Sequence, residues 1–284
     1  MKIKNLTSAL PEKGSFAWIM MMMGLASIVL ILLPFAFWYA VWHGPSIGPG
    51  EVEKALAEPV EPSAAGSMVL RIAEKISRQD RAMQRWYPRL IDLSRHAAPH
   101  LRRTTAWAMG KDPKSEAFHA RLREMVNDQD RHVRRAAAVS LSAFEDPAAR
   151  KELVTAIRPH VVLSTLAGSV NLRILPKDTA SPETAVARVG DSFVEAGIFG
   201  TVKRLLVKEG DPVSAGQPLV EITPAPEETR DMLRALARVG VQEDLAAIQE
   251  CLGDSTEAMV REEGQNAIRA IERRGNSTAG VRIQ

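Results

Sequence analysis

Residues 200–222, GTVKRLLVKEGDPVSAGQPLVEI, decide how the middle of this chain folds. Residues 202–207 fit a strand that turns one apolar face inward, and Gly210-Asp211-Pro212 supplies the residue types of a tight turn. Gly216-Gln217-Pro218 makes a second turn, after which residues 219–222 begin another strand. Short strands separated by glycine and proline turns predict a small β-barrel or sandwich.

The same stretch resembles the second half of a biotinyl/lipoyl domain and of the similar barrels in membrane fusion proteins. The resemblance covers residues 160–224 and implies that residues 193–196 form the strand after the modification hairpin, whose tip falls at residues 188–191. Carrier members bear their acylated or biotinylated lysine at that tip, where this chain has Val189. The resemblance therefore implies a docking module rather than a carrier, and we expect no cofactor. The turn residues expected in this barrel are Gly200, Gly210, Asp211 and Gly216.

The N-terminal region contains a long uncharged segment, Ser15–Trp42. A helix needs about 20 apolar residues to cross a bilayer, and a cleaved signal peptide has a shorter core of roughly 7–15 residues. Lysines in residues 1–14 and acidic residues after the segment predict a cytoplasmic N-terminus. We therefore expect an uncleaved anchor in a bacterial inner membrane, with residues 15–42 spanning it and the rest outside the cytoplasm. The aromatic residues expected at its interfaces are Trp18, Trp38, Tyr39 and Trp42.

Residues 43–66 combine prolines with small and acidic residues, a composition that predicts a semi-rigid linker. The single cysteine, Cys251, excludes an intrachain disulfide framework and a cysteine-rich metal site. We expect Cys251 to be a small core residue on a helix.

The rest of the sequence contains internal repeats. The segment HLRRTTA at residues 100–106 matches HVRRAAA at residues 132–138, an offset of 32 positions. A further copy lies near Val260-Arg261. Each unit is two amphipathic helices with small residues where neighbours cross, and the pattern resembles HEAT-type repeats.

The expected helices do not all form neighbouring pairs along the chain. The helices over Pro147–Arg158 and Glu227–Val239 have no neighbouring partner along the chain. They form a pair with each other if the barrel is inserted between them. Ser67–Arg78 is expected to cap the first repeat, because terminal repeats need atypical covers. The neighbouring pairs are 82–95 with 98–110, 114–127 with 130–144, and 242–252 with 256–273.

The sequence thus predicts a mainly α fold, a HEAT-like α-solenoid with an inserted small all-β barrel-sandwich domain. The repeats occupy residues 67–158, the β domain follows at residues 160–224, and the repeats resume at residues 226–274. Residues 275–284 form a tail.

The first repeats are rich in arginine. In HEAT-like repeats an aspartate at the turn between helices often pairs with an arginine of the next helix, and Asp128 with Arg134 and Asp254 with Arg261 match that scheme. An acidic protein or a lipid headgroup is the alternative use of this charge, and nucleic acid is not expected outside the cytoplasm. The residues expected on a partner-binding surface are Arg102, Arg103, Arg134, Arg135, Arg188 and Val189.

No nucleophile–base arrangement, phosphate loop or paired acidic motif stands out in the sequence. His96 and His100 are spaced like metal ligands but lack an obvious third ligand. We therefore expect neither an enzyme nor a metal site.

The function expected is that of a non-catalytic, single-pass membrane scaffold. It would be an accessory or assembly subunit of a bacterial membrane complex, a respiratory complex being one setting, whose partners are other subunits or envelope proteins. Two alternatives stay open: an adaptor of the membrane-fusion type in a transport system, and a lipoyl or biotin carrier modified at Lys177.

Overall fold

The computed structural model describes residues 16–43, 48–254 and 257–281 of the 284-residue chain. The chain divides into two compact units, Met1–Lys54 and Ala55–Gln284. Each unit is described by itself.

The first unit contains helix α1 (Phe16–His43), which is 28 residues long and carries no acidic or basic residue apart from its terminal histidine. Within the described residues, no helix is both long and apolar enough to cross a membrane. The span expected over Ser15–Trp42 stays a prediction. Part of it lies outside what the structure describes, namely Ser15 and the side chains of Trp38, Tyr39 and Trp42.

The stretch expected to be a semi-rigid linker, residues 43–66, includes helical segments. Helix α2 (Pro49–Ala55) and the first turn of α3 (Pro62–Ser77) fall within it. Glu61 caps α3 by accepting hydrogen bonds from the backbone N–H groups of Ser63 and Ala64, at 3.2 and 2.6 Å. Pro49 and Pro62 are the first residues of their helices, where proline needs no hydrogen-bond donor, so these prolines start helices instead of extending a linker.

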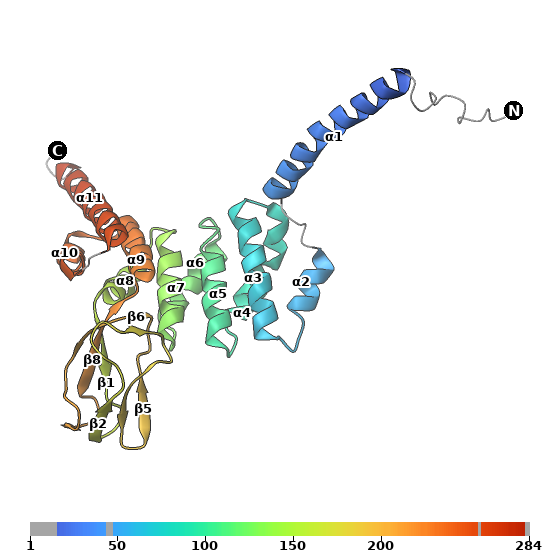
Figure 1. Ribbon diagram of the computed structural model, residues 1–284. Coiled ribbons are helices and arrows are strands. Elements are labelled where there is room, and N and C mark those ends of the chain that lie inside the picture. Colours follow the sequence, from blue (N-terminus) through green and yellow to red (C-terminus); the bar gives the residue numbers. More distant parts are fainter. Residues whose placement is uncertain (1–15, 44–47, 255–256, 282–284) are drawn as a thin grey trace. The chain divides into compact units, whose positions relative to one another are not determined.

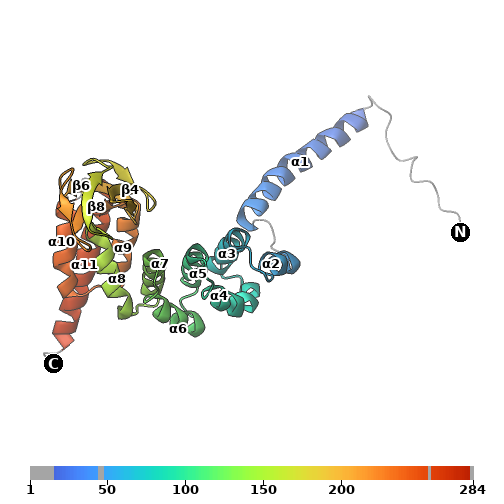
Figure 2. The ribbon, with the colours of Figure 1, turned by 90° about the horizontal axis from the view of Figure 1, so that it is seen from below.

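Helices of the second unit form two rows (Figures 1 and 2). In the first, here called row A, each helix contacts the next. The helices of the second set, row B, each contact the row A helix that follows them in the chain. Row A comprises α3, α5 (Pro99–Met109), α7 (Arg131–Ser142), α9 (Pro226–Val239) and α11 (Ala258–Val281). Row B comprises α4 (Tyr87–Leu93), α6 (Glu116–Met125), α8 (Arg150–Ile157) and α10 (Leu245–Asp254).

Apolar residues spaced three and four apart make each helix bury one face. In α3, Val69, Ile72 and Ile76 are buried, which places this helix against the first repeat at the start of row A. Where α5 and α7 meet, Gly110 lies so close to Ser140 that a Cβ atom on the glycine would be 2.6 Å from the serine Oγ. Small residues therefore set how closely these helices pack.

The β region lies between α8 and α9 in the chain and consists of two antiparallel four-stranded sheets. Their strand orders are β1-β8-β6-β3 and β5-β4-β2-β7. Side chains from both sheets form one core, which includes Val162, Val186, Val202 and Ile222. A helical region plus this β-rich region confirms the mainly α fold. The strands are β1 (His160–Leu163), β2 (Gly168–Leu172), β3 (Thr179–Ala180), β4 (Ala185–Val189), β5 (Ser192–Glu195), β6 (Gly200–Leu205), β7 (Pro212–Val213) and β8 (Pro218–Pro224).

The two sheets correspond strand for strand, and two of their turns are built alike. Asp178 Oδ2 accepts a hydrogen bond from Leu175 N–H at 2.8 Å, and Asp211 Oδ2 accepts one from Lys208 N–H at 2.8 Å. The residues before these aspartates, Lys177 and Gly210, have left-handed backbones with φ of 76° and 83°. Leu175, Lys177 and Asp178 precede Lys208, Gly210 and Asp211 by the same number of residues. The β region is therefore an internal repeat.

The expected turn residues fall into two groups. Gly210, Asp211 and Gly216 lie in turns, where Gly216 has φ of 82°. Gly200 does not lie in a turn. It begins β6, and a Cβ atom there would be 2.2 Å from the carbonyl oxygen of Thr223 on β8. Its role is to let two strands approach each other.

We predict that Gly200→Ala destabilises the β region by about 2 kcal/mol or more, because the new methyl group must push β6 from β8. Thermal and urea unfolding followed by circular dichroism measure the loss, and hydrogen exchange shows whether it is confined to residues 160–224.

The matched control is Gly66→Ala in α3, where a Cβ atom meets nothing within 4 Å. That variant should be unchanged or gain up to ~1 kcal/mol from helix propensity. Equal midpoints for both variants would contradict the steric account.

Candidate partner-binding surfaces

A groove of ≈ 430 Å³ crosses row A from α3 to α9. Its apolar lining includes Leu70 of α3, Trp107 of α5, Val139 of α7 and Met232 of α9. Leu70 and Trp107 are 49% and 40% exposed. Four consecutive row A helices thus line one apolar strip, which is exposed at Leu70 and Trp107 and buried at Met232.

Charged side chains border the strip with opposite signs. Arg103 and Arg135 come from α5 and α7, whereas Glu228 and Asp231 come from α9. Arg135 pairs with Glu228 at 3.1 Å. Lys111 lies 3.8 Å from the centroid of the Trp107 ring, and burial lowers the pKa of this lysine while Asp231 acts in the opposite direction. The groove therefore offers an apolar strip with a basic and an acidic side.

Of the arginines expected on a binding surface, Arg103 and Arg135 meet in this groove. Arg102 and Arg134 have a structural role instead. Arg102 Nη1 donates to the carbonyl oxygens of His96 and Ala97, at 3.0 and 2.9 Å. Arg134 Nη1 makes the equivalent bonds to the two residues six and five positions before it, at 2.8 and 3.0 Å. These bonds satisfy carbonyl groups that the turns between helices leave without a partner.

The predicted ion pair between Asp128 and Arg134 is wrong, because each of these residues pairs with a different side chain. The Asp128 carboxylate accepts two hydrogen bonds from Arg102, at 2.8 and 2.7 Å, and Arg134 reaches only the Asp128 carbonyl oxygen. Arg134 pairs with Glu152 at 3.3 Å instead. The pair predicted between Asp254 and Arg261 lies outside what the structure describes, because the Asp254 side chain is not placed.

The hairpin expected at residues 188–191 turns at Gly190 and Asp191, between β4 and β5. Val189 is fully buried in the β core, so its assignment to a binding surface is wrong. Arg188 is exposed but is bound to its own turn, to the Gly190 carbonyl and the Asp191 carboxylate, each at 2.9 Å.

A polar contact joins the helices to the β region. Arg131 Nη1, at the start of α7, lies 2.9 Å from Nε2 of His160 on β1. Burial, followed by the charges of Arg131 and Arg135, lowers the pKa of His160 to about 4. The imidazole is therefore neutral at neutral pH and can accept the hydrogen bond from Arg131. No sequence pattern marks His160, since only the fold brings it next to Arg131.

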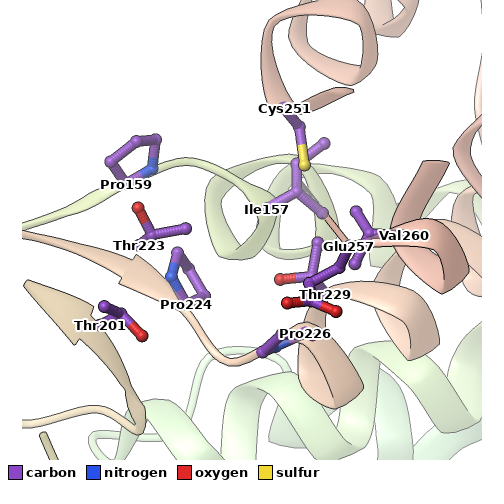
Figure 3. Close-up of a pocket in the computed structure, with 10 residues that line it drawn as sticks. All are labelled: Ile157, Pro159, Thr201, Thr223, Pro224, Pro226, Thr229, Cys251, Glu257 and Val260. Carbon is purple, nitrogen blue, oxygen red and sulfur yellow. The ribbon is translucent and has the colours of Figure 1, made fainter. Parts of the chain in front are cut away.

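A second hollow of ≈ 330 Å³ lies between β6, β8 and the helices α8 to α11 (Figure 3). Prolines and threonines supply much of its lining, and Cys251 of α10 and Glu257 are its ionisable lining residues. Cys251 is buried, as expected of a small core residue.

The two histidines spaced like metal ligands take part in ordinary local structure. His96 Nδ1 accepts a hydrogen bond from Ala98 N–H at 3.0 Å, and His100 lies in the first turn of α5. Over residues 16–43, 48–254 and 257–281, no three His, Cys, Asp or Glu side chains gather as a metal site would require.

Comparison with known proteins agrees with the helical architecture. Residues 87–164 match the family model for HEAT repeats, a range that runs from α4 to β1. No curated protein matches this chain. The HEAT-type repeats predicted from the sequence are confirmed over this range, and HEAT repeats suggest a protein-interaction scaffold.

We predict that Asp128→Asn destabilises the helical region by about 1–3 kcal/mol, because it leaves a mostly buried guanidinium without its carboxylate. The side chains of Arg102 and Asp128 are only 15% and 12% exposed. A double-mutant cycle with Arg102→Gln, measured by urea unfolding, isolates the coupling between the two.

The control is the exposed pair Arg188–Asp191, where Arg188→Gln should change stability little. A coupling near zero at Arg102–Asp128 would show that the two side chains do not stabilise the repeats together.

We also predict that the protein loses stability as the pH falls from about 6.5 towards 4. The pKa of His160 is lowered by folding, so the unfolded chain takes up this proton first and gains free energy relative to the folded chain. Burial lowers the pKa of His132 as well and adds to the same slope. In His160→Asn the slope over this range should be shallower.

His100→Asn serves as the control, because His100 is exposed. Urea unfolding of the three proteins at a series of pH values makes the comparison. Identical slopes for all three would rule out the assigned role of His160.

Proposed function

We propose that this chain is a non-catalytic, membrane-anchored scaffold that holds a partner protein in the row A groove. The observation that carries the proposal is the partly exposed apolar strip shared by four helices of a HEAT-like array. Repeat arrays present extended surfaces of this kind, which suit the binding of other proteins.

The lining suggests what the partner presents to the groove. An amphipathic helix would place apolar side chains against Leu70 and Trp107, and burying such side chains contributes about 1.5–3 kcal/mol each. Trp107 and Arg103 are residue types that often dominate binding energy. Acidic residues on the side facing Arg103 and basic residues on the side facing Asp231 would set the direction of the bound helix.

The proposal includes an anchor, which rests on the sequence of Ser15–Trp42. This segment carries no charge, and as a helix it would rise about 40 Å at 1.5 Å per residue. Lysines before the segment support an N-terminus in the cytoplasm and a scaffold outside it, and aromatic residues near both ends support its placement between two membrane interfaces. A place in the bacterial inner membrane would suit an accessory or assembly subunit of a membrane complex.

The β region is proposed to be a biotinyl/lipoyl-like docking module. Its two equivalent sheets support this, and so does the β4–β5 hairpin tip, which has Gly190 and Asp191 in place of a lysine. Lys177 lies in a different turn, where its N–H group donates to the Val202 carbonyl at 2.8 Å. That position is equivalent to Gly210, so it does not favour the carrier alternative, which intact mass measurement of the protein from cells tests directly.

We predict that Leu70→Asp and Arg103→Glu each reduce recovery of the partner about tenfold, which corresponds to ~1.4 kcal/mol of binding free energy. Both side chains are at least partly exposed, so the fold should be kept. The full-length tagged chain is purified from its own membranes in mild detergent, and co-purifying proteins are quantified by mass spectrometry.

Leu175→Asp is the matched control, since Leu175 is 66% exposed on the β region. It should leave recovery unchanged. Equal recovery with all variants would move the binding site away from row A, and recovery of a lone monomer in several detergents would contradict the scaffold proposal.

A further inference from the structure

Four arginines gather where α7 and α8 meet β1. They line a notch of ≈ 220 Å³ that also contains Glu152 and His160. Three of the arginines come from the first turns of α7, and the fourth follows α8 directly. The notch thus brings four guanidinium groups together with one carboxylate. The four arginines are Arg131, Arg134, Arg135 and Arg158.

The acidic groups nearby do not neutralise this charge. Glu152 pairs with Arg134 at 3.3 Å, and the partner of Arg135 is Glu228, which does not line the notch. Arg131 and Arg158 form no ion pair with any carboxylate in the described part of the chain. Two cations therefore face the notch without a counter-ion from the protein.

The surroundings of Arg131 show the same imbalance. Burial lowers its pKa, and the charges of Arg135 and Arg134 lower it further, against the opposing effects of Glu152 and Asp130. Asp130 is already engaged at the start of α7, where its carboxylate accepts hydrogen bonds from two backbone N–H groups at 2.9 and 3.0 Å. His160, the hydrogen-bond partner of Arg131, is neutral at neutral pH and supplies no charge.

Arg135 gives a second, independent indication that the notch lacks an anionic partner. Its side chain is 9% exposed, and its Nε atom is buried without a hydrogen-bond partner among the described residues. A buried donor left unsatisfied is costly, and such groups are rare in proteins. An anion in the notch would offset the unbalanced charge around this side chain.

We propose that the notch binds a tetrahedral oxyanion, the phosphate group of a phosphomonoester or of a lipid headgroup. The arginines that line the notch come from two segments, the start of α7 and the residue directly after α8. A phosphomonoester offers three strong acceptor oxygens to several arginines at once, whereas a carboxylate offers two. Arg131 and Arg158 are the principal contacts of the oxyanion, whereas Arg134 is engaged by Glu152 and by the backbone carbonyls before α7.

Binding would also have a mechanical consequence. Arg131 belongs to the repeats and His160 to the β region, and the notch lies between them. A bound anion would hold α7, the end of α8 and β1 together, and so stabilise the position of the β region on the helices. This inference does not depend on what the row A groove binds.

The test is thermal unfolding of the full-length chain in neutral detergent, with inorganic phosphate exchanged for chloride at constant ionic strength. The wild type should gain at least about 2 °C in Tm at saturating phosphate. Arg158→Gln should lose this gain, and its fold is expected to be kept because Arg158 is exposed. Arg131→Gln should lose the gain as well.

Lys151→Gln is the matched control, because this exposed lysine lies on α8, outside the notch, and its loss removes the same charge. It should keep the full gain. Equal gains in all four proteins would reflect a general salt effect and would overturn the proposal, as would the absence of any gain in the wild type.

The two sources of the phosphate group are separated by adding phosphatidylglycerol to the detergent micelles. If the site takes a lipid headgroup, the lipid raises the Tm of the wild type and of Lys151→Gln, and phosphate then adds nothing. If the site takes a soluble phosphate, the lipid has no effect that depends on Arg158, and the gain from phosphate persists.

Discussion

Helix α9 packs against both α7 and α8, although the whole β region separates it from them in the chain. This contact makes row A continuous, because α11 in turn packs on α9. Two ion pairs also join residues that precede the β region to residues that follow it. Arg150 of α8 holds Asp244 with two hydrogen bonds of 3.0 and 3.1 Å, and Arg135 of α7 holds Glu228 of α9. The continuity of the helical rows depends on this packing of α9 against α7 and α8.

The packing of α9 against α7 and α8 also affects where a binding surface can form. The chain leaves the helices after α8 and returns at α9, so the β region is attached at both of its ends. Loop-closure entropy rises slowly with loop length, and a folded insertion whose ends lie close together costs the array little. The groove across row A needs α9 next to α7, and the basic notch needs β1 next to α7. The groove therefore depends on the contact of α9 with α7, whereas the notch depends on β1 following α8 beside α7.

The arginines show how far sequence reasoning reaches. The repeated Arg-Arg pairs at residues 102–103 and 134–135 indicated the repeats and their period, because the same helix position recurs at a fixed offset. Which arginine of each pair faces a turn and which faces the groove could not be read from the pattern. Arg102 and Arg134 satisfy backbone carbonyls, whereas Arg103 and Arg135 border the groove. Neighbours in a helix point about 100° apart, and only the packing of the rows assigns their directions.

The sequence by itself determined the helical repeats, the interruption by short strands and the turns at Gly210 and Gly216, because apolar periodicity and glycine backbone freedom act locally. Only the tertiary structure decided that Val189 is buried, that Gly200 marks a close approach of two strands, and that Asp128 pairs with Arg102. It also brought His160 to Arg131. These outcomes depend on which segments become neighbours in space, and no local pattern of residues encodes the distance between groups that are far apart in the chain.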